Sequence, residues 1–167
     1  MMKLIAIAGL LFCFLACDGG LQHEIPIQPG FGGVIHFAQN SWPPIDSLVN
    51  LWVFASQIYP LDSTSVFAGL FIAQPPQIFL YPPGEARVAL NVDSADFFFP
   101  LPPSTYKYVG ILQQFNSTLN IRSFRVVGFY FDPKDPSQPL SVLVKDGQQV
   151  SGVNMNVDFR NPPPQPF

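Results

Sequence analysis

The clearest alternation of apolar and polar residues lies near the end of the chain, between Val150 and Phe159. Residues 153, 155, 157 and 159 are apolar, and the residues between them are Asn, Asn and Asp. Because period two places alternate side chains on opposite faces of a strand, the segment is predicted to be a strand with one buried face. Leu140–Val144 precedes it, followed by the hairpin-turn signal Asp146-Gly147. We therefore expect the two segments to pair as a hairpin.

Short β-branched and aromatic runs, separated by Pro, Gly, Asp and Asn, continue through residues 32–159. This pattern is typical of an all-β domain, and the 19 prolines argue against long helices. The run Leu51–Ala55 is apolar throughout, so its strand is either covered on both faces or meets a partner. We expect a single antiparallel β-sandwich of about seven strands. Further strands are predicted at Gly33–Gln39, Val49–Ile58, Val66–Ala73, Glu85–Val92, Asp96–Leu101, Thr105–Gln113 and Phe124–Phe131.

The first 16 residues have a different character. Lys3 supplies a positive charge, Leu4–Leu15 contains no charged residue, and Ala16 is small. A basic start, a short apolar run and a small residue at its end indicate a secretory signal peptide, which is removed on export. The run is shorter than the ~20 residues that a membrane span needs. A small buried helix of the domain is the alternative interpretation.

The residues Phe14-Leu15-Ala16-Cys17 resemble the lipobox of bacterial lipoproteins, in which the Cys thiol is acylated and becomes the new N-terminus. Leu is usual at the position of Phe14, and a small residue is commoner at that of Leu15. The resemblance implies an anchor of acyl chains such as palmitate on Cys17, and a location at the bacterial outer membrane or cell surface. A plain signal peptide cut nearby is the alternative. Cys13 is the other cysteine, so the processed chain is expected to have no disulfide.

These patterns divide the chain into four parts. Residues 1–16 form the signal peptide, and residues 17–31 form a lipidated Cys with a flexible tether rich in Gly and Pro. Residues 32–159 form the sandwich. Residues 160–167 form a Pro-rich tail that cannot continue a sheet and is expected to be extended and mobile.

Composition narrows the classes of partner. Charged residues make up 11% of the chain and hydrophobic residues 48%. Removal of residues 1–16 takes Lys3 with it, leaving 7 basic and 11 acidic residues and a net charge of −4. No cluster of Lys or Arg is present, so nucleic-acid binding is not expected. Low charge and many aromatic residues favour a surface that contacts a partner.

Residues for catalysis are scarce. The 2 histidines are His23, in the tether, and His36, within a predicted strand, where a surface or half-buried position is expected. No nucleophile and base stand in a recognisable motif. Asp93 and Asp96 bracket an apparent turn, and Asp132-Pro133-Lys134-Asp135 is also interpreted as a turn, since Asp bonds its own backbone there. A calcium site at Asp132 and Asp135 is the alternative for the second pair. We expect no enzyme activity, no metal and no cofactor.

Aromatic residues next to prolines are the candidates for ligand contact: Trp42, Tyr59, Tyr81 and Phe98. Rings held in rigid loops can stack on sugars or apolar ligands at a small entropic cost. The alternative is that these rings close the ends of the core. Within Phe97–Phe99, consecutive side chains must point to opposite faces, so at least one ring meets a second layer or stays exposed.

The order of segments resembles the transthyretin-like (prealbumin-like) β-sandwich modules, which include the carboxypeptidase regulatory-like domains of bacterial envelope proteins. The resembling segments are Gly32–Phe37, Val53–Ala55, Phe99–Tyr108, Val142–Gly147 and the final alternating strand. Phe99–Tyr108 is similar to the family's Leu-Pro-x-Gly-x-Tyr turn, with Ser104 in place of the Gly. The resemblance implies a seven-stranded sandwich with a scaffolding or binding role and no conserved catalytic set. An immunoglobulin-like sandwich has the same strand count and alternation.

These observations together predict a non-enzymatic, lipid-anchored envelope protein. Its membrane contact is the N-terminal lipid, and its expected ligand is a protein partner in the envelope. A carbohydrate-binding module that uses the loop aromatics is the alternative function.

Overall fold

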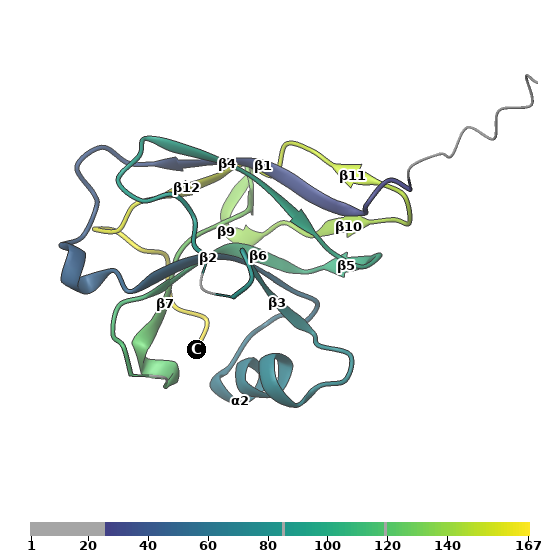
Figure 1. Ribbon diagram of the computed structural model, residues 1–167, viewed down its shortest axis with the longest axis horizontal. Coiled ribbons are helices and arrows are strands. Elements are labelled where there is room, and N and C mark those ends of the chain that lie inside the picture. The colour runs from purple at the N-terminus through teal and green to yellow at the C-terminus, as the bar shows by residue number, and fades with distance from the viewer. Residues whose placement is uncertain (1–25, 85, 119) are drawn as a thin grey trace, which may run out of the picture.

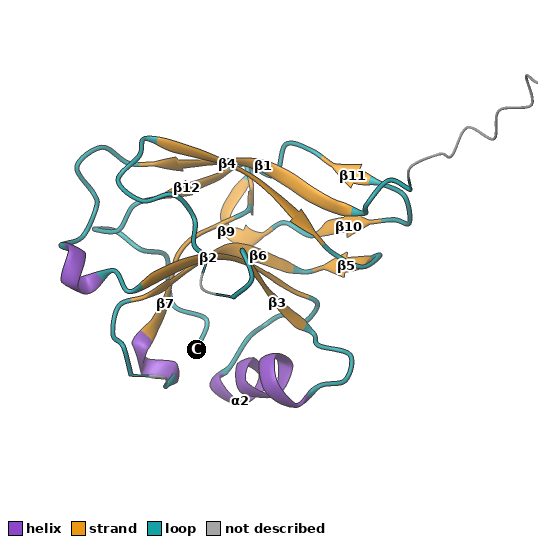
Figure 2. Cartoon of the chain, in the orientation of Figure 1, coloured by secondary structure: helices purple, strands orange, loops and turns teal. Residues whose placement is uncertain are grey.

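The computed structural model describes residues 26–84, 86–118 and 120–167. The predicted signal peptide, Cys17 and most of the tether, including His23, lie outside the described residues. Figures 1 and 2 show a chain built mainly of strands, with short helical turns at its periphery. The prediction of an all-β sandwich is confirmed. No helix in the described ranges is long and apolar enough to cross a membrane.

Two four-stranded sheets form the sandwich. In sheet A, β1 (Gly30–Phe37) pairs antiparallel with β4 (Ser94–Pro100) along one edge. Its other edge pairs in parallel with β11 (Gln149–Val150) and then β12 (Met155–Val157). Sheet B is antiparallel and has the order β3-β2-β6-β7. Its strands are β2 (Asn50–Ser56), β3 (Ile78–Tyr81), β6 (Tyr108–Gln114) and β7 (Phe124–Phe129).

Two strand pairs and several helical turns complete the fold. Strand β5 (Ser104–Tyr106) pairs with β10 (Val142–Val144), and β8 (Phe131–Asp132) pairs with β9 (Asp135–Pro139). The helical elements are α2 (Ser63–Phe67), the π-helical turn η2 (Ala68–Ile72), and the 3-10 turns η1 (Ile45–Ser47) and η3 (Ile121–Ser123).

The layer between the two sheets is the main core. The period-two prediction is confirmed at the final strand, because Val153, Met155, Val157 and Phe159 are buried while Asn154 and Asn156 are exposed. Other fully enclosed members come from both sheets and from β5: Phe31, Ile35, Leu51, Val53, Ala55, Tyr106, Val109 and Ile111.

A second apolar cluster covers the outer face of sheet B. Phe54 and Val126 lie on this face, and α2 supplies Val66 to the same cluster. Figure 1 shows α2 and the C-terminal segment lying on this side of the sheet. The prediction for Leu51–Ala55 is therefore resolved, because β2 is covered on both faces.

The strand predicted at Val66–Ala73 is wrong, because the segment is helical. Asp62 caps the turn: its carboxylate accepts a hydrogen bond from the Ser65 backbone N–H at 2.8 Å, and Ser65 Oγ accepts one from the Asp62 N–H at 2.8 Å. This reciprocal capping box satisfies backbone donors that a helix start leaves free. The apolar run that follows has no alternation to distinguish a strand from a helix.

The strand predicted at Glu85–Val92 is also wrong for residues 86–92, which form none; Glu85 lies outside the described residues. Val88 is buried and its N–H donates to the Leu51 carbonyl at 3.2 Å. Asn91 then adopts a positive φ of 55°, which interrupts an extended chain. The neighbouring strand of β2 is instead β3, within a segment interpreted above as a loop.

The predicted hairpin between Leu140–Val144 and the final strand is wrong as well. The Asp146-Gly147 turn is present, with Gly147 at φ 63° and a hydrogen bond from Gln148 N–H to the Lys145 carbonyl. However, β10 pairs with β5, whereas β11 and β12 pair with β1. The turn therefore connects a strand that pairs with β5 to strands that pair with β1, and both partners lie far away in the sequence.

Candidate functional site

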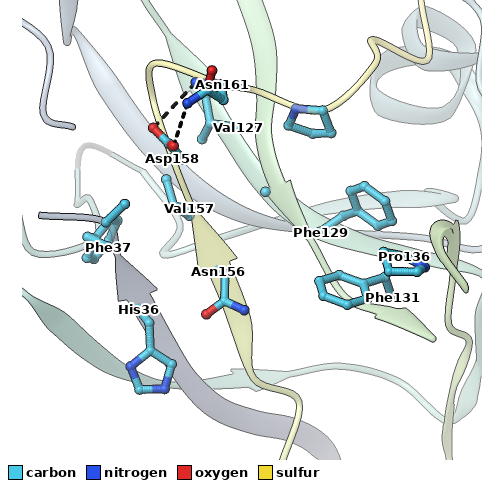
Figure 3. Close-up of a pocket in the computed structure, with 13 residues that line it drawn as sticks. His36, Phe37, Val127, Phe129, Phe131, Pro136, Asn156, Val157, Asp158 and Asn161 are labelled. Carbon is cyan, nitrogen blue, oxygen red and sulfur yellow. Dashed lines mark hydrogen bonds between the residues drawn. The ribbon is translucent and has the colours of Figure 1, made fainter. Parts of the chain in front are cut away.

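A surface groove with a volume of about 440 Å³ lies where the open edges of the two sheets approach each other. Figure 3 shows its walls, which come from β1 and β12 on one side and from β7 and β8 on the other. The β8–β9 hairpin adds Pro136, and the segment after β12 adds Asn161 and Pro163.

The floor of the groove depends on a close approach of two backbones. A Cβ on Gly128 of β7 would overlap the backbone oxygen of Asn156 in β12. Glycine therefore allows the edges of sheet A and sheet B to approach at this point without a side chain between them. Val127 and Gly128 of β7 both line the groove at this point.

One wall of the groove is aromatic. The rings of Phe129 and Phe131 meet edge to face with centroids 6.0 Å apart, and both side chains are half-buried. Phe129 also contacts Tyr108, at 5.7 Å between ring centroids. These contacts hold the two rings in place and leave part of their surface open, which suits an apolar or sugar-like ligand face.

The opposite wall is polar. His36 and Asn156 are neighbours in the β1–β12 register, and both side chains are exposed. The Asp158 carboxylate accepts hydrogen bonds from the Arg160 backbone N–H at 2.9 Å and from Asn161 Nδ2 at 2.8 Å. The hydrogen bond from Asn161, followed by that from Arg160, lowers the pKa of Asp158 from its ordinary value. The groove therefore keeps a carboxylate beside amide groups.

The groove combines several kinds of chemical group. It offers ring faces, amide groups, a carboxylate and an imidazole on one open surface. Within the described ranges, no three His, Cys, Asp or Glu side chains gather to hold a metal ion. The exposed position of His36 agrees with its prediction as a surface or half-buried residue.

Three of the four predicted contact residues support the folded domain. Trp42 packs on Phe37 and Phe159 with ring centroids 4.5 and 4.9 Å away, and its Nε1 donates to the Val92 carbonyl. Tyr81 lies in β3 rather than in a loop, with its ring 5.2 Å from that of Phe99. These two side chains close the edges of the main core.

Phe98 is the third of these supporting residues. Its neighbours Phe97 and Phe99 point into the core, as the alternation predicts, and Phe98 lies half-buried on the outer face of sheet A. A Cβ on Gly30 would lie 3.0 Å from its ring, and one on Gly32 would lie 3.4 Å away. The ring thus covers a glycine-lined stretch of β1, where no side chain would otherwise pack.

Tyr59 remains the most accessible of the four, with 40% of its surface exposed and its ring 5.3 Å from that of Tyr108. Trp42 and Tyr81 pack against the main core, Tyr59 contacts Tyr108 of the second cluster, and Phe98 covers the outer face of sheet A. The structure therefore does not gather the four residues into one site. None of them lines the groove.

The acidic pairs have separate outcomes. The turn predicted at residues 132–135 is confirmed, because Asp132 accepts from the Lys134 N–H and Asp135 accepts from the Ser137 N–H. The turn predicted between Asp93 and Asp96 is wrong, since β4 already begins at Ser94 and Asp96 pairs with Val34.

Sequence reasoning missed the groove. Phe129 and Phe131 stand two apart in the sequence, a spacing that could have suggested one shared surface. Their proximity to Asn156 and Asp158 depends on pairings that no local pattern reveals. No family model, no curated protein and no solved structure matches the chain.

Proposed function

We propose that this chain is an exported bacterial lipoprotein that is held at the cell envelope by acyl chains on Cys17. The observation that carries the proposal is the sequence from Met1 to Cys17: a basic start, an uncharged apolar run, and a small residue before a cysteine. Twelve residues lie between Cys17 and Gly30, so 13 residue-to-residue steps of about 3.3–3.6 Å connect the two and can span at most roughly 45 Å. The sandwich therefore works close to a membrane surface.

The anchor is tested by exchanging each of the two cysteines. Cys17→Ser should abolish incorporation of a labelled fatty acid and move the protein out of the membrane fraction. Cys13→Ser is the matched control, because this residue leaves with the signal segment, and it should behave as wild type. Mass spectrometry of the native N-terminus should find acylated Cys17. A mature chain that begins upstream of Cys17, or that carries no fatty acid, would contradict the proposal.

The strand order supports a transthyretin-like rather than an immunoglobulin-like domain. In the immunoglobulin order the second and third strands belong to different sheets, and the first pairs with the second. Here β2 pairs directly with β3, and β1 lies in the other sheet between β4 and the β11–β12 segment. Modules that resemble transthyretin act as scaffolds or binding domains, which agrees with a groove suited to contact.

At the envelope, the domain binds a protein partner and catalyses no reaction. The groove is the candidate contact surface, because it exposes Phe129 and Phe131 next to hydrogen-bonding side chains. Aromatic anchors surrounded by polar groups are typical of protein-binding surfaces. A cross-linker placed at Pro136 should capture the partner in native membranes. Phe131→Ala should reduce the captured complex, whereas Leu143→Ala, an exposed apolar residue on β10, should leave it unchanged. Equal loss in both variants would contradict docking at the groove.

Carbohydrate binding is the second candidate, and the composition of the groove favours it. Half-exposed rings can stack on sugar faces, and Asn156, Asp158 and Asn161 can hydrogen-bond to hydroxyl groups. This candidate predicts glycan binding that weakens in Phe131→Ala and Asn156→Ala. Weakening in Trp42→Ala or Tyr81→Ala would instead favour binding through the aromatic residues that stand next to prolines. An array of diverse glycans with no binding at all would exclude this function.

A further inference from the structure

The Pro-rich tail is docked on the domain. Gln165 is an exposed residue, yet its side-chain amide bonds both backbone groups of Val126 in β7. Its Oε1 accepts from the Val126 N–H at 2.8 Å, and its Nε2 donates to the Val126 carbonyl at 3.0 Å. Nε2 also donates to the Pro163 carbonyl at 2.7 Å, which fixes the shape of the tail itself. These contacts are at odds with the prediction of a mobile tail.

Gln165 therefore substitutes for a neighbouring strand at the open edge of β7. Sheet edges present unpaired N–H and C=O groups that can accept another chain. Proline lacks an N–H, so a tail with Pro at 162, 163, 164 and 166 cannot form a regular ladder. One glutamine side chain supplies both the N–H donor that a proline backbone lacks and an acceptor for the Val126 N–H.

The tail also covers part of the outer face of sheet B. Trp52, Leu112 and Val126 lie in one row across β2, β6 and β7, as their pairing registers show. The Trp52 ring lies 6.3 Å from that of Phe124, and Phe167 packs against the cluster on this face. In Figure 1 the C-terminal segment passes beneath the sheet, between β7 and α2.

Proline-rich segments adopt an extended helix and bind surfaces lined with aromatic side chains at a small entropic cost. The outer face beside β7 has the aromatic pair of Trp52 and Phe124 and the apolar row described above. It also has the Val126 backbone, whose N–H and carbonyl both bond one glutamine side chain. We propose that this face is a binding site for proline-rich segments that carry Gln-Pro followed by an aromatic residue, and that the chain's own tail fills it in cis. A partner segment of this kind binds when it displaces the tail.

The chain's own tail competes with any free peptide for this face, so it lowers the apparent affinity of the peptide. A tethered segment has an effective concentration in the millimolar range, so a free peptide binds the wild-type protein weakly. Removing the Gln165 amide should free the site without changing the face that the peptide contacts. This inference does not depend on the lipid anchor or on the groove.

The test uses the whole chain, purified in detergent, and a fluorescent peptide with the sequence of residues 160–167, Arg-Asn-Pro-Pro-Pro-Gln-Pro-Phe. Gln165→Ala should bind the peptide roughly tenfold more tightly than wild type, since two hydrogen bonds of the competing tail are lost. Gln149→Ala is the matched control, because it removes a glutamine that bonds the Gln28 carbonyl elsewhere in the fold, and it should bind like wild type. A peptide with Ala in place of its Gln should bind Gln165→Ala at least tenfold more weakly.

A second readout follows the Val126 amide directly. Its hydrogen exchange should accelerate in Gln165→Ala and slow again when the peptide is added. Circular dichroism shows whether each variant is folded; a variant that unfolds is replaced by Gln165→Glu, which lacks the amide donor. Equal peptide affinity in wild type and Gln165→Ala would overturn the proposal. So would equal binding of the Ala-substituted peptide, or no change in exchange at Val126.

Discussion

The two faces of sheet B are both apolar, but they are covered in different ways. On the inner face, Leu51, Val53 and Ile111 meet sheet A in a layer that is closed from solvent. On the outer face, Phe54, Leu112 and Val126 are covered by α2 and the docked tail. The inner cover is sheet A, in whose strands every second side chain is apolar and points toward sheet B. The outer cover consists of segments with no such alternation, held by a helix cap and by one glutamine.

This difference separates the layer that stabilises the fold from the cover that a partner segment can displace. The inner layer combines buried side chains from strands far apart in the sequence, so its loss would unfold the domain. The outer cover is attached through a few polar contacts near the surface, each of which contributes modestly. We therefore expect substitutions in the inner layer to cost the most free energy of unfolding.

The largest effect is expected for Phe31→Ala. Phe31 is fully buried, and its ring lies 5.6 Å from that of Phe99 and 6.1 Å from that of Phe97. Removal of a buried phenyl ring typically lowers the free energy of unfolding by about 3–5 kcal/mol. Phe98→Ala, on the outer face of the same sheet, should cost markedly less. Urea unfolding measures both, and equal losses would contradict the assignment of inner and outer faces.

A smaller loss is expected for Gly128→Ala, at the seam between the sheets. The added Cβ would overlap the Asn156 backbone oxygen, so β7 and β12 must move apart. Overpacking of this kind costs typically 1–3 kcal/mol. The control is Asn156→Ala, which removes an exposed side chain but leaves the backbone oxygen, and it should change stability by less than about 0.5 kcal/mol. An unchanged urea midpoint in Gly128→Ala would mean that the edges are not in close contact.

The same comparison explains what the sequence could predict. Val153, Met155, Val157 and Phe159 revealed a buried face, because period two is a local signal. Phe97 and Phe99 were separated from Phe98 by the same reasoning. The partner of that last strand could not be predicted, since β1 lies some 120 residues earlier, and the adjacent Asp-Gly turn favoured β10.

The helical cover was missed for a different reason. Asp62 and Ser65 are a local cap signal, but the apolar and β-branched residues after them fit a strand equally well. The candidate site needed both kinds of information. Its walls place Phe129 near Asn156. Three of the four aromatic residues that were chosen for their proline neighbours instead support packing elsewhere in the domain.

Ser65→Ala tests the outer cover and should have a moderate effect. Ser65 Oγ accepts from the Asp62 N–H and donates to the Asp62 carbonyl, so the variant loses both bonds at the start of α2. A loss of about 1 kcal/mol is expected. Ser63→Ala, at an exposed position in the same turn, serves as the control and should be nearly neutral. If both variants unfold at the same urea concentration, the reciprocal cap does not stabilise this helix.

The smallest effect at neutral pH is expected for Tyr106→Phe, which tests a polar group at the rim of the inner layer. The Tyr106 hydroxyl donates to the Pro102 carbonyl at 2.8 Å, and burial raises the pKa of Tyr106 to about 12. Because Pro102 is exposed, water can replace the lost donor, and a cost near 0.5 kcal/mol is expected.

At alkaline pH Tyr106→Phe should become the more stable of the two proteins, although it is the less stable one at neutral pH. A folded pKa above the unfolded value near 10 means that the folded state retains its proton longer. The wild-type protein therefore keeps this contribution below pH 10 and loses it progressively as the pH rises through 10 to about 12. Tyr106→Phe has no hydroxyl to ionise at this position, so its urea midpoint should fall less steeply with pH. The pKa of Tyr108 is also raised, and its ionisation lowers the midpoint of both proteins equally. Parallel curves across this range would show that the Tyr106 hydroxyl is not buried in the folded domain, and that the inner layer is open to water at this rim.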